Sequence, residues 1–211
     1  GFGNYAKMFS SPYFWPALKN TLLLFCLIPI CLLLGLFLAL IMDQGLRGTT
    51  VFRTLILLPF ALSFVVTGTV WAYMYRPTGG VLNSFLKMLG VNVSAAMADG
   101  HLMWASSNAT IMLSIIIAMV WQFSGYVAVI FLAAIKNVPV NVINAAKLDG
   151  AYMPRIYFKM VIPQLKGAMG SCITILAMYA LRSFDFIVSL VGYTTSSAWT
   201  LPIWMYNEAF Q

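Results

Sequence analysis

Charged residues are scarce in this chain. Only 8% of its 211 residues are charged and 62% are hydrophobic, whereas soluble domains carry roughly 25% charged residues. A soluble fold of this composition would leave large apolar patches in water, so we expect an all-α, polytopic helical membrane protein. The excess of 12 Lys and Arg over 5 Asp and Glu is typical of cytoplasmic loops in such proteins and does not indicate nucleic-acid binding.

Side chains for catalysis or metal binding are equally few. The sequence has one histidine, His101, and three cysteines, Cys26, Cys31 and Cys172, all within apolar runs. These groups cannot assemble a convincing metal site or hydrolytic triad, and no Gly-x-x-x-x-Gly-Lys-Ser/Thr cradle for ATP phosphates is present. We therefore expect no catalytic residue, metal or cofactor on this chain. The small-residue run Gly167-Ala168-Met169-Gly170 predicts close helix packing instead.

Long apolar runs predict four complete membrane spans and the start of a fifth. A helix needs about 20 residues to cross the bilayer core. The runs cover residues 21–42, 52–75, 109–135 and 167–191, and another begins at residue 201. Pro59 is expected to kink the second span. Residues 1–211 then form a single transmembrane domain, which we expect to be part of a longer protein.

Basic residues predict the orientation of these spans. One side of the membrane receives seven of them, Arg47, Arg53 and five in the loop 136–166, and the other side receives four. The side with more Lys and Arg is the cytoplasmic one, so residues 136–166 are expected inside and residues 76–108 outside.

The loop 136–166 has helix signals of its own. Pro139 can begin a helix, Gly150 can end it in a left-handed cap, Pro154 suits the first turn of a second helix, and Pro163 should break the chain again. Two short helices meeting at a glycine could receive a partner protein, or they could form an amphipathic connector that rests on lipid. The residue pattern alone leaves both interpretations open.

A resemblance to a known family favours the first interpretation. Residues 144–150, Asn-Ala-Ala-Lys-Leu-Asp-Gly, followed after nine residues by Met160-Val161-Ile162-Pro163, resemble the EAA loop of ABC importer permeases. Asn144 stands where that family has glutamate. Further stretches in the same order resemble the sugar-uptake, maltose-permease branch, from Asn20-Thr21-Leu22 to Thr200-Leu201-Pro202.

This resemblance implies a type I ABC importer permease in the cell membrane of a prokaryote. Such a subunit moves a sugar or oligosaccharide inward by alternating access, together with a second permease, two cytoplasmic ATPase subunits that use ATP and Mg²⁺, and an extracytoplasmic solute-binding protein. The residues implied in ATPase coupling are Asn144, Ala145, Ala146, Asp149, Gly150, Ala151 and Pro163.

Two other functions are alternatives to sugar import. The first is an ABC permease for a polyol, sugar phosphate or peptide. The second, a secondary transporter, would need more midplane ionisable residues.

Two groups of residues are candidates for the substrate pathway. Trp121, Gln122 and Ser124 fall near the middle of the third span, where an aromatic ring could stack on a sugar and an amide could bond its hydroxyls; ordinary helix packing is the alternative. Arg182 and Asp185 are three residues apart, which predicts one helix face, either as a structural ion pair or as a lining of the outward cavity.

The orientation can be tested by labelling in whole cells. Single cysteines replace Ser94 and Asn141 in separate variants, and a membrane-impermeant thiol reagent is added outside. We expect the cysteine at position 94 to react and the one at 141 to be protected. Preferential labelling at 141 would reverse the predicted topology.

Overall fold

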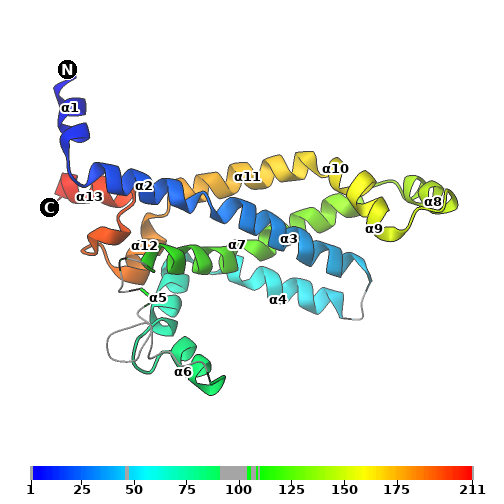
Figure 1. The fold of residues 1–211 in the computed structure, drawn as a ribbon, viewed down its shortest axis with the longest axis horizontal. Helices are drawn as coiled ribbons and strands as arrows, with labels where there is room; N and C mark the ends of the chain where they lie inside the picture. The colour runs from blue at the N-terminus through cyan, green and yellow to red at the C-terminus, as the bar shows by residue number, and fades with distance from the viewer. Residues whose placement is uncertain (1, 46–47, 91–103, 106–107, 109, 211) are drawn as a thin grey trace. The chain divides into compact units, whose positions relative to one another are not determined.

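The computed structural model describes residues 2–45, 48–90, 104–105, 108 and 110–210 (Figure 1). Within these residues every regular element is a helix, which confirms the all-α prediction; His101 and Ser94 lie outside them. The elements are α1 (Gly3–Ser10), α2 (Phe14–Leu24), α3 (Leu27–Asp43), α4 (Thr49–Ala61), α5 (Phe64–Met74), α6 (Val81–Met88), α7 (Ile111–Lys136), α8 (Val140–Leu148), α9 (Met153–Ile156), the π-helix η3 (Tyr157–Val161), α10 (Ile162–Gln164), α11 (Lys166–Leu181), α12 (Phe184–Val191), the 3₁₀ turn η4 (Ser196–Ala198) and α13 (Leu201–Phe210).

Two of the described helices are long and apolar enough to cross a membrane. One is Phe14–Asp43, in which a turn at Phe25 and Cys26 separates α2 from α3, and the other is α7. The number rises to four if two interrupted pairs each count as one span. These pairs are α4 with α5, and the segment Met153–Gln164 with α11. The first span therefore begins earlier than residue 21, and α7 agrees with the predicted run 109–135 within two residues.

The second predicted span is interrupted in a different place from the one expected. Pro59 lies inside α4, and the break falls at Leu62 and Ser63. Ser63 has an extended backbone, and its hydroxyl accepts a hydrogen bond from the Val66 amide at 3.3 Å, which is the usual way a serine starts a helix. The prediction of a kink at Pro59 was wrong because a capping serine four residues beyond it sets the boundary.

The fourth predicted span is two helices rather than one. α11 ends at Leu181 and α12 begins at Phe184. Between them Ser183 leaves the helical region with ψ near 27°, and the Phe184 amide bonds to the Arg182 carbonyl at 2.9 Å. The continuous helix predicted over 167–191 was therefore wrong, because a tight turn interrupts it at Arg182 and Ser183.

The helices group into two compact units, each assembled from separate stretches of chain. The first comprises residues 1–27, 62–119 and 178–211, and the second comprises residues 28–61 and 120–177. No single cut in the sequence would separate them. That the chain is one transmembrane domain remains a prediction.

In the first unit, polar side chains of α2 hold the chain leading into α13. The Asn20 amide donates hydrogen bonds to the carbonyls of Ser197 and Trp199 at 3.0 and 2.9 Å, and the Thr21 hydroxyl accepts one from the Leu201 amide at 2.9 Å. These bonds satisfy backbone groups next to helix ends, which would otherwise be costly to bury. They also bring together the first and last stretches of the family resemblance.

In the second unit, two glycines allow α7 to approach its neighbours closely. A Cβ at Gly125 would overlap the Ile56 carbonyl of α4, with its carbonyl carbon only 2.7 Å away, and a Cβ at Gly35 of α3 would lie 2.8 Å from the Val127 Cβ. The absence of side chains at these positions lets helix backbones approach, as is common between membrane helices.

The run Gly167-Ala168-Met169-Gly170 does not pack in this way. A Cβ at Gly167 or Gly170 would meet no atom within 4 Å, and both residues are exposed. The prediction that this run packs closely against another helix was therefore wrong for contacts within this chain, because no other helix of the chain lies against Gly167 or Gly170.

These glycines give a matched test of the packing. Gly125→Ala is expected to lower the stability of the purified protein by about 1–3 kcal/mol, because the new methyl group overlaps backbone that cannot rotate away. Gly170→Ala adds the same methyl group on an open helix face and should leave stability unchanged or slightly raised. Thermal unfolding in detergent measures both. Equal melting temperatures for the two variants would contradict the contact between α7 and α4.

Candidate coupling site

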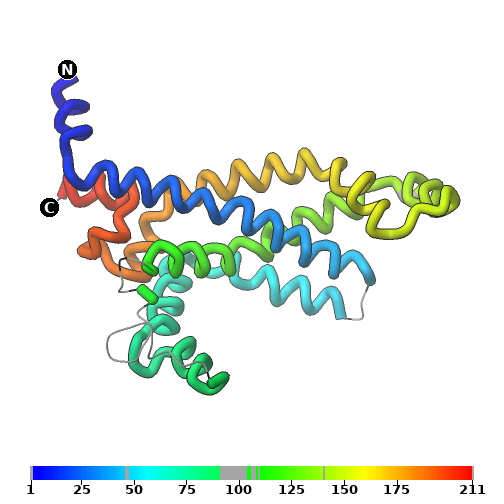
Figure 2. Tube along the Cα trace, viewed as in Figure 1, coloured from blue at the N-terminus to red at the C-terminus, as the bar shows by residue number. Residues whose placement is uncertain are grey.

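The loop between α7 and α11 contains a short helix that ends at a glycine. α8 is capped at its C-terminus by Gly150, whose φ is +77°. The Gly150 amide bonds to the Lys147 carbonyl and the Ala151 amide to the Ala146 carbonyl, both at 3.0 Å. This pair of bonds is a Schellman motif, so the predicted left-handed cap is confirmed. Figure 2 shows the chain leaving α7, passing through α8 at the end of its unit, and turning back toward α11.

Most of α8 and its cap is exposed. Asn144, Ala145, Asp149 and Gly150 are open to solvent, and the Leu148 side chain is 89% exposed. Ala146 is buried, with 6% of its surface accessible. The two alanines of the motif therefore differ: Ala145 lies on the outer surface, whereas Ala146 packs against the chain.

The second half of the loop is helical as expected, but Pro163 does not break it. α9 begins at Met153 with Pro154 in its first turn, η3 follows, and Pro163 lies inside α10; the break comes at Leu165. The Ile162 amide bonds to the Tyr157 carbonyl, five residues back. Pro163 cannot donate a backbone hydrogen bond, and widening the preceding turn to a π-helix lets the helix continue past it. The expected break before the next spanning helix is therefore present, but it falls at Leu165, two residues after Pro163.

A hydrogen bond joins this half of the loop to the end of α3. The Tyr157 hydroxyl donates to the Asp43 carboxylate at 2.6 Å, a length typical of a bond to an ionised acceptor. Asp43 is the last residue of α3, where the helix dipole disfavours negative charge, so the phenol compensates an unfavourable position. Burial, the hydrogen bond and the charge of Asp43 raise the pKa of Tyr157 to about 12, so the phenol is a donor at neutral pH.

The loop surface is strongly positive. Five basic side chains are exposed on it, and Asp149 is the one acid between residues 136 and 166. The basic residues are Lys136, Lys147, Arg155, Lys159 and Lys166. Their exposure is consistent with the predicted cytoplasmic placement, which remains a prediction.

The candidate pathway residues on α7 point in different directions. Trp121 is 40% exposed and Ser124 is half-buried, and three residues apart they share a helix face. Gln122 is fully buried within the chain. The structure therefore keeps Trp121 and Ser124 together and separates Gln122 from them.

Arg182 and Asp185 do not share a helix face. Arg182 lies in the break before α12, and Asp185 is in the first turn of α12, where a carboxylate interacts favourably with the helix dipole. Both side chains are exposed. The prediction of one helical face for this pair was wrong because the turn at Ser183 redirects the chain.

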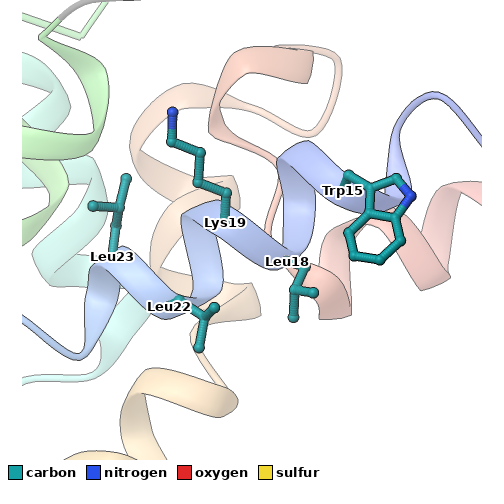
Figure 3. A pocket seen from close by; sticks show the side chains of 5 residues that line it. All are labelled: Trp15, Leu18, Lys19, Leu22 and Leu23. Atoms are coloured by element: carbon teal, nitrogen blue, oxygen red, sulfur yellow. The ribbon is translucent and has the colours of Figure 1, made fainter.

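Other candidate sites are weak. A groove of about 380 Å³ lies on α2, and Figure 3 shows the side chains that line it, Trp15, Leu18, Lys19, Leu22 and Leu23. All five come from one helix and four are apolar, so this is an outer surface suited to lipid or another helix. Within the described ranges no three His, Cys, Asp or Glu side chains gather as a metal ion requires.

Comparison with known proteins identifies the family. The family of binding-protein-dependent transport system inner membrane components matches residues 31–211. The chain belongs to this family. It is similar to a probable ABC transporter permease of Pyrococcus horikoshii, with 43% identity over the whole chain and 70% of that protein. It is also similar to a xylose/arabinose import permease of Haloferax volcanii, with 39% identity over 89% of the chain and 57% of the relative.

Solved structures agree on the fold. Crystal structures of a bacterial ABC transporter that imports alginate contain a chain similar to all of this one, with a TM-score of 0.82 and 22% identity, and the match covers 73% of that chain in one of them. Another holds the transporter in complex with an alginate pentasaccharide-bound periplasmic protein. The chain thus has the helical ABC importer permease fold, and it spans less than two thirds of the Haloferax relative.

The contact between Tyr157 and Asp43 was missed by the sequence reasoning. An acid that ends an apolar run is a visible signal, but its partner lies 114 residues away. Sequence spacing cannot pair residues across that distance without the fold.

This contact predicts a measurable interaction energy. Tyr157→Phe removes the hydroxyl alone and should destabilise the permease by about 1–2 kcal/mol, whereas Tyr152→Phe, on an exposed ring of the same segment, should have little effect. A double-mutant cycle with Asp43→Ala, which removes the acceptor, followed by unfolding in detergent, isolates the pairwise energy. Additive effects of the two single substitutions would show that the hydrogen bond contributes nothing.

Proposed function

We propose that the chain is the membrane-spanning subunit of an ATP-driven ABC importer for a sugar or oligosaccharide. Membership of the binding-protein-dependent transport family supports the importer role. The relative named for xylose/arabinose import and the structural neighbour named for alginate import support a carbohydrate substrate. The observation that carries the proposal is the exposed helix α8, ended by a Schellman cap at Gly150 in a loop that resembles the EAA motif.

The exposed face of α8 suits contact with an ATPase subunit. Leu148 is 89% exposed, and burying such a side chain in a partner groove contributes roughly 1.5–3 kcal/mol. Ala145 and Gly150 carry little or no side chain, so a partner can approach the backbone closely. We propose Asn144, Ala145, Asp149 and Gly150 as contacts.

The remaining motif residues hold α8 to the rest of its unit. Ala146 packs inward and its carbonyl accepts the Ala151 amide, while Pro163 lies in the helix that follows. The π-helix η3, which leads directly into α10, is hydrogen-bonded through Tyr157 to the end of α3. α8 is thus linked through the backbone at Ala151 and Tyr152, and then through the bond between Tyr157 and Asp43, to the end of a spanning helix. We propose that movement of a docked ATPase reaches the spanning helices by this route.

The proposed partners follow from this role. The importer would comprise this chain, a second permease, two cytoplasmic ATPase subunits that use ATP and Mg²⁺, and an extracytoplasmic solute-binding protein, in the cell membrane of a prokaryote. The chain itself would bind no nucleotide. The family description names dependence on a binding protein.

The exposed face of Trp121 and Ser124 is the proposed sugar-contacting surface of α7. An indole ring can stack on the apolar face of a sugar and a hydroxyl can bond its edge. Arg182 and Asp185 are proposed as further polar groups on the pathway.

Trp121→Ala should reduce uptake at limiting substrate without changing assembly of the complex, because the indole ring that stacks on the sugar is lost. Unchanged uptake in this variant would show that Trp121 serves only in helix packing.

Gly150→Val is expected to uncouple the transporter. A side chain at φ near +77° costs roughly 1–2 kcal/mol and displaces the cap, yet the position is open and outside the predicted spans, so membrane insertion should be unchanged. We expect the ATPase to co-purify poorly, or to remain bound while its hydrolysis no longer drives uptake.

Four further substitutions help to interpret that result, and Gly45→Val is its matched control. Gly45→Val imposes the same strain at φ +70° in another open loop position and should leave coupling intact. Ala145→Arg should block docking with a folded permease, whereas Ala146→Arg should disturb folding because the site is buried. Asn144→Ala should be mild, since no charge is lost. Normal ATPase association and normal uptake in Gly150→Val would show that the loop does not couple the ATPase to transport.

A further inference from the structure

The segment that follows α8 has two contrasting faces. Its inner face is fixed to its unit by Ile156 and Val161, each 1% exposed, and by the hydrogen bond from Tyr157 to Asp43. Its outer face carries exposed side chains on residues other than these anchors. The outer side chains are therefore available for another role.

The outer face forms a basic groove of about 500 Å³. It is lined by Tyr152, Pro154, Arg155, Phe158 and Lys159. Arg155 and Lys159 are four residues apart and so lie on one side of the helix, and no acidic side chain takes part in the lining. A planar guanidinium beside an ammonium is well suited to hold a phosphate, the first by two parallel hydrogen bonds and the second as a mobile point charge.

The aromatic side chains of the groove indicate where that phosphate comes from. Tyr152 is 66% exposed and Phe158 is 72% exposed, which is unfavourable in water but typical of rings at the level of lipid headgroups. The segment also leads within a few residues into the apolar helix α11. Basic side chains beside a spanning helix attract anionic lipids.

We propose that this groove binds the phosphate headgroup of an anionic phospholipid, with Arg155 and Lys159 on the phosphate and Tyr152 and Phe158 against the glycerol and upper acyl chains. The loop then has two surfaces with separate partners: α8 for the ATPase and the groove for lipid. Lipid in the groove would hold the second half of the loop at the membrane surface while α8 projects beyond it. This inference requires the loop to lie at a membrane surface and does not depend on which solute is transported.

The test is native mass spectrometry of the full permease complex in detergent. The complex is titrated with phosphatidylglycerol or with phosphatidylcholine of the same acyl chains, and inorganic phosphate serves as a separate competitor. We expect one phosphatidylglycerol to bind in preference to phosphatidylcholine and to resist competition by free phosphate. In R155Q/K159Q that affinity should fall about 25-fold, from roughly a five-fold contribution of each of the two basic side chains.

The control removes the same charge elsewhere on the loop. K136Q/K166Q leaves the groove intact and should keep wild-type phosphatidylglycerol affinity. Wild-type affinity in R155Q/K159Q, an equal loss in the control, or equal binding of the two lipids would overturn the proposal. Loss of the ATPase from R155Q/K159Q with lipid binding unchanged would also overturn it, since the groove would then be a protein contact. Uptake is not the readout, so failure here is distinguishable from failure of the proposed transport role.

Discussion

Backbone hydrogen bonding within a bilayer is the constraint on which this structure depends. Lipid offers no partner to an amide or carbonyl, so the chain must remain helical where it crosses. Each helix end then needs a specific solution. Ser63 caps α5, Asn20 and Thr21 satisfy backbone groups before α13, and a π-turn carries the helix past Pro163. These polar side chains and the π-turn accordingly lie where helices begin or end.

In the loop between α7 and α11, the way each helix end is stabilised bears directly on the proposed function. Its Schellman cap at Gly150 closes α8 without help from another element, so the helix can project and still keep its shape. The half that follows is anchored by Ile156, Val161 and the bond between Tyr157 and Asp43. A projecting helix on an anchored base is mechanically suited to pass movement from a partner to the spanning helices, and this is the core of the proposed role.

Sequence reasoning recovered what composition and local chemistry determine. The length of an apolar run located α7, and a glycine after a short amphipathic stretch located the cap at Gly150. The breaks at Ser63 and Ser183 were missed because a serine inside an apolar run does not reveal whether it caps a helix or packs within one. The burial of Ala146, the separation of Gln122 from Trp121, and the pairing of Tyr157 with Asp43 depend on which helices are neighbours, which no local pattern encodes.

The most direct test of the account is the energy source for transport through the reconstituted complex. Proteoliposomes would contain the permease pair and its ATPase subunits, and uptake would be followed for the sugar that the solute-binding protein retains on purification. The account predicts uptake that requires ATP on the side of the loop 136–166 and the binding protein on the other side, and that survives ionophores that collapse ion gradients. Uptake by the permease without the ATPase, driven by an imposed ion gradient, would contradict it.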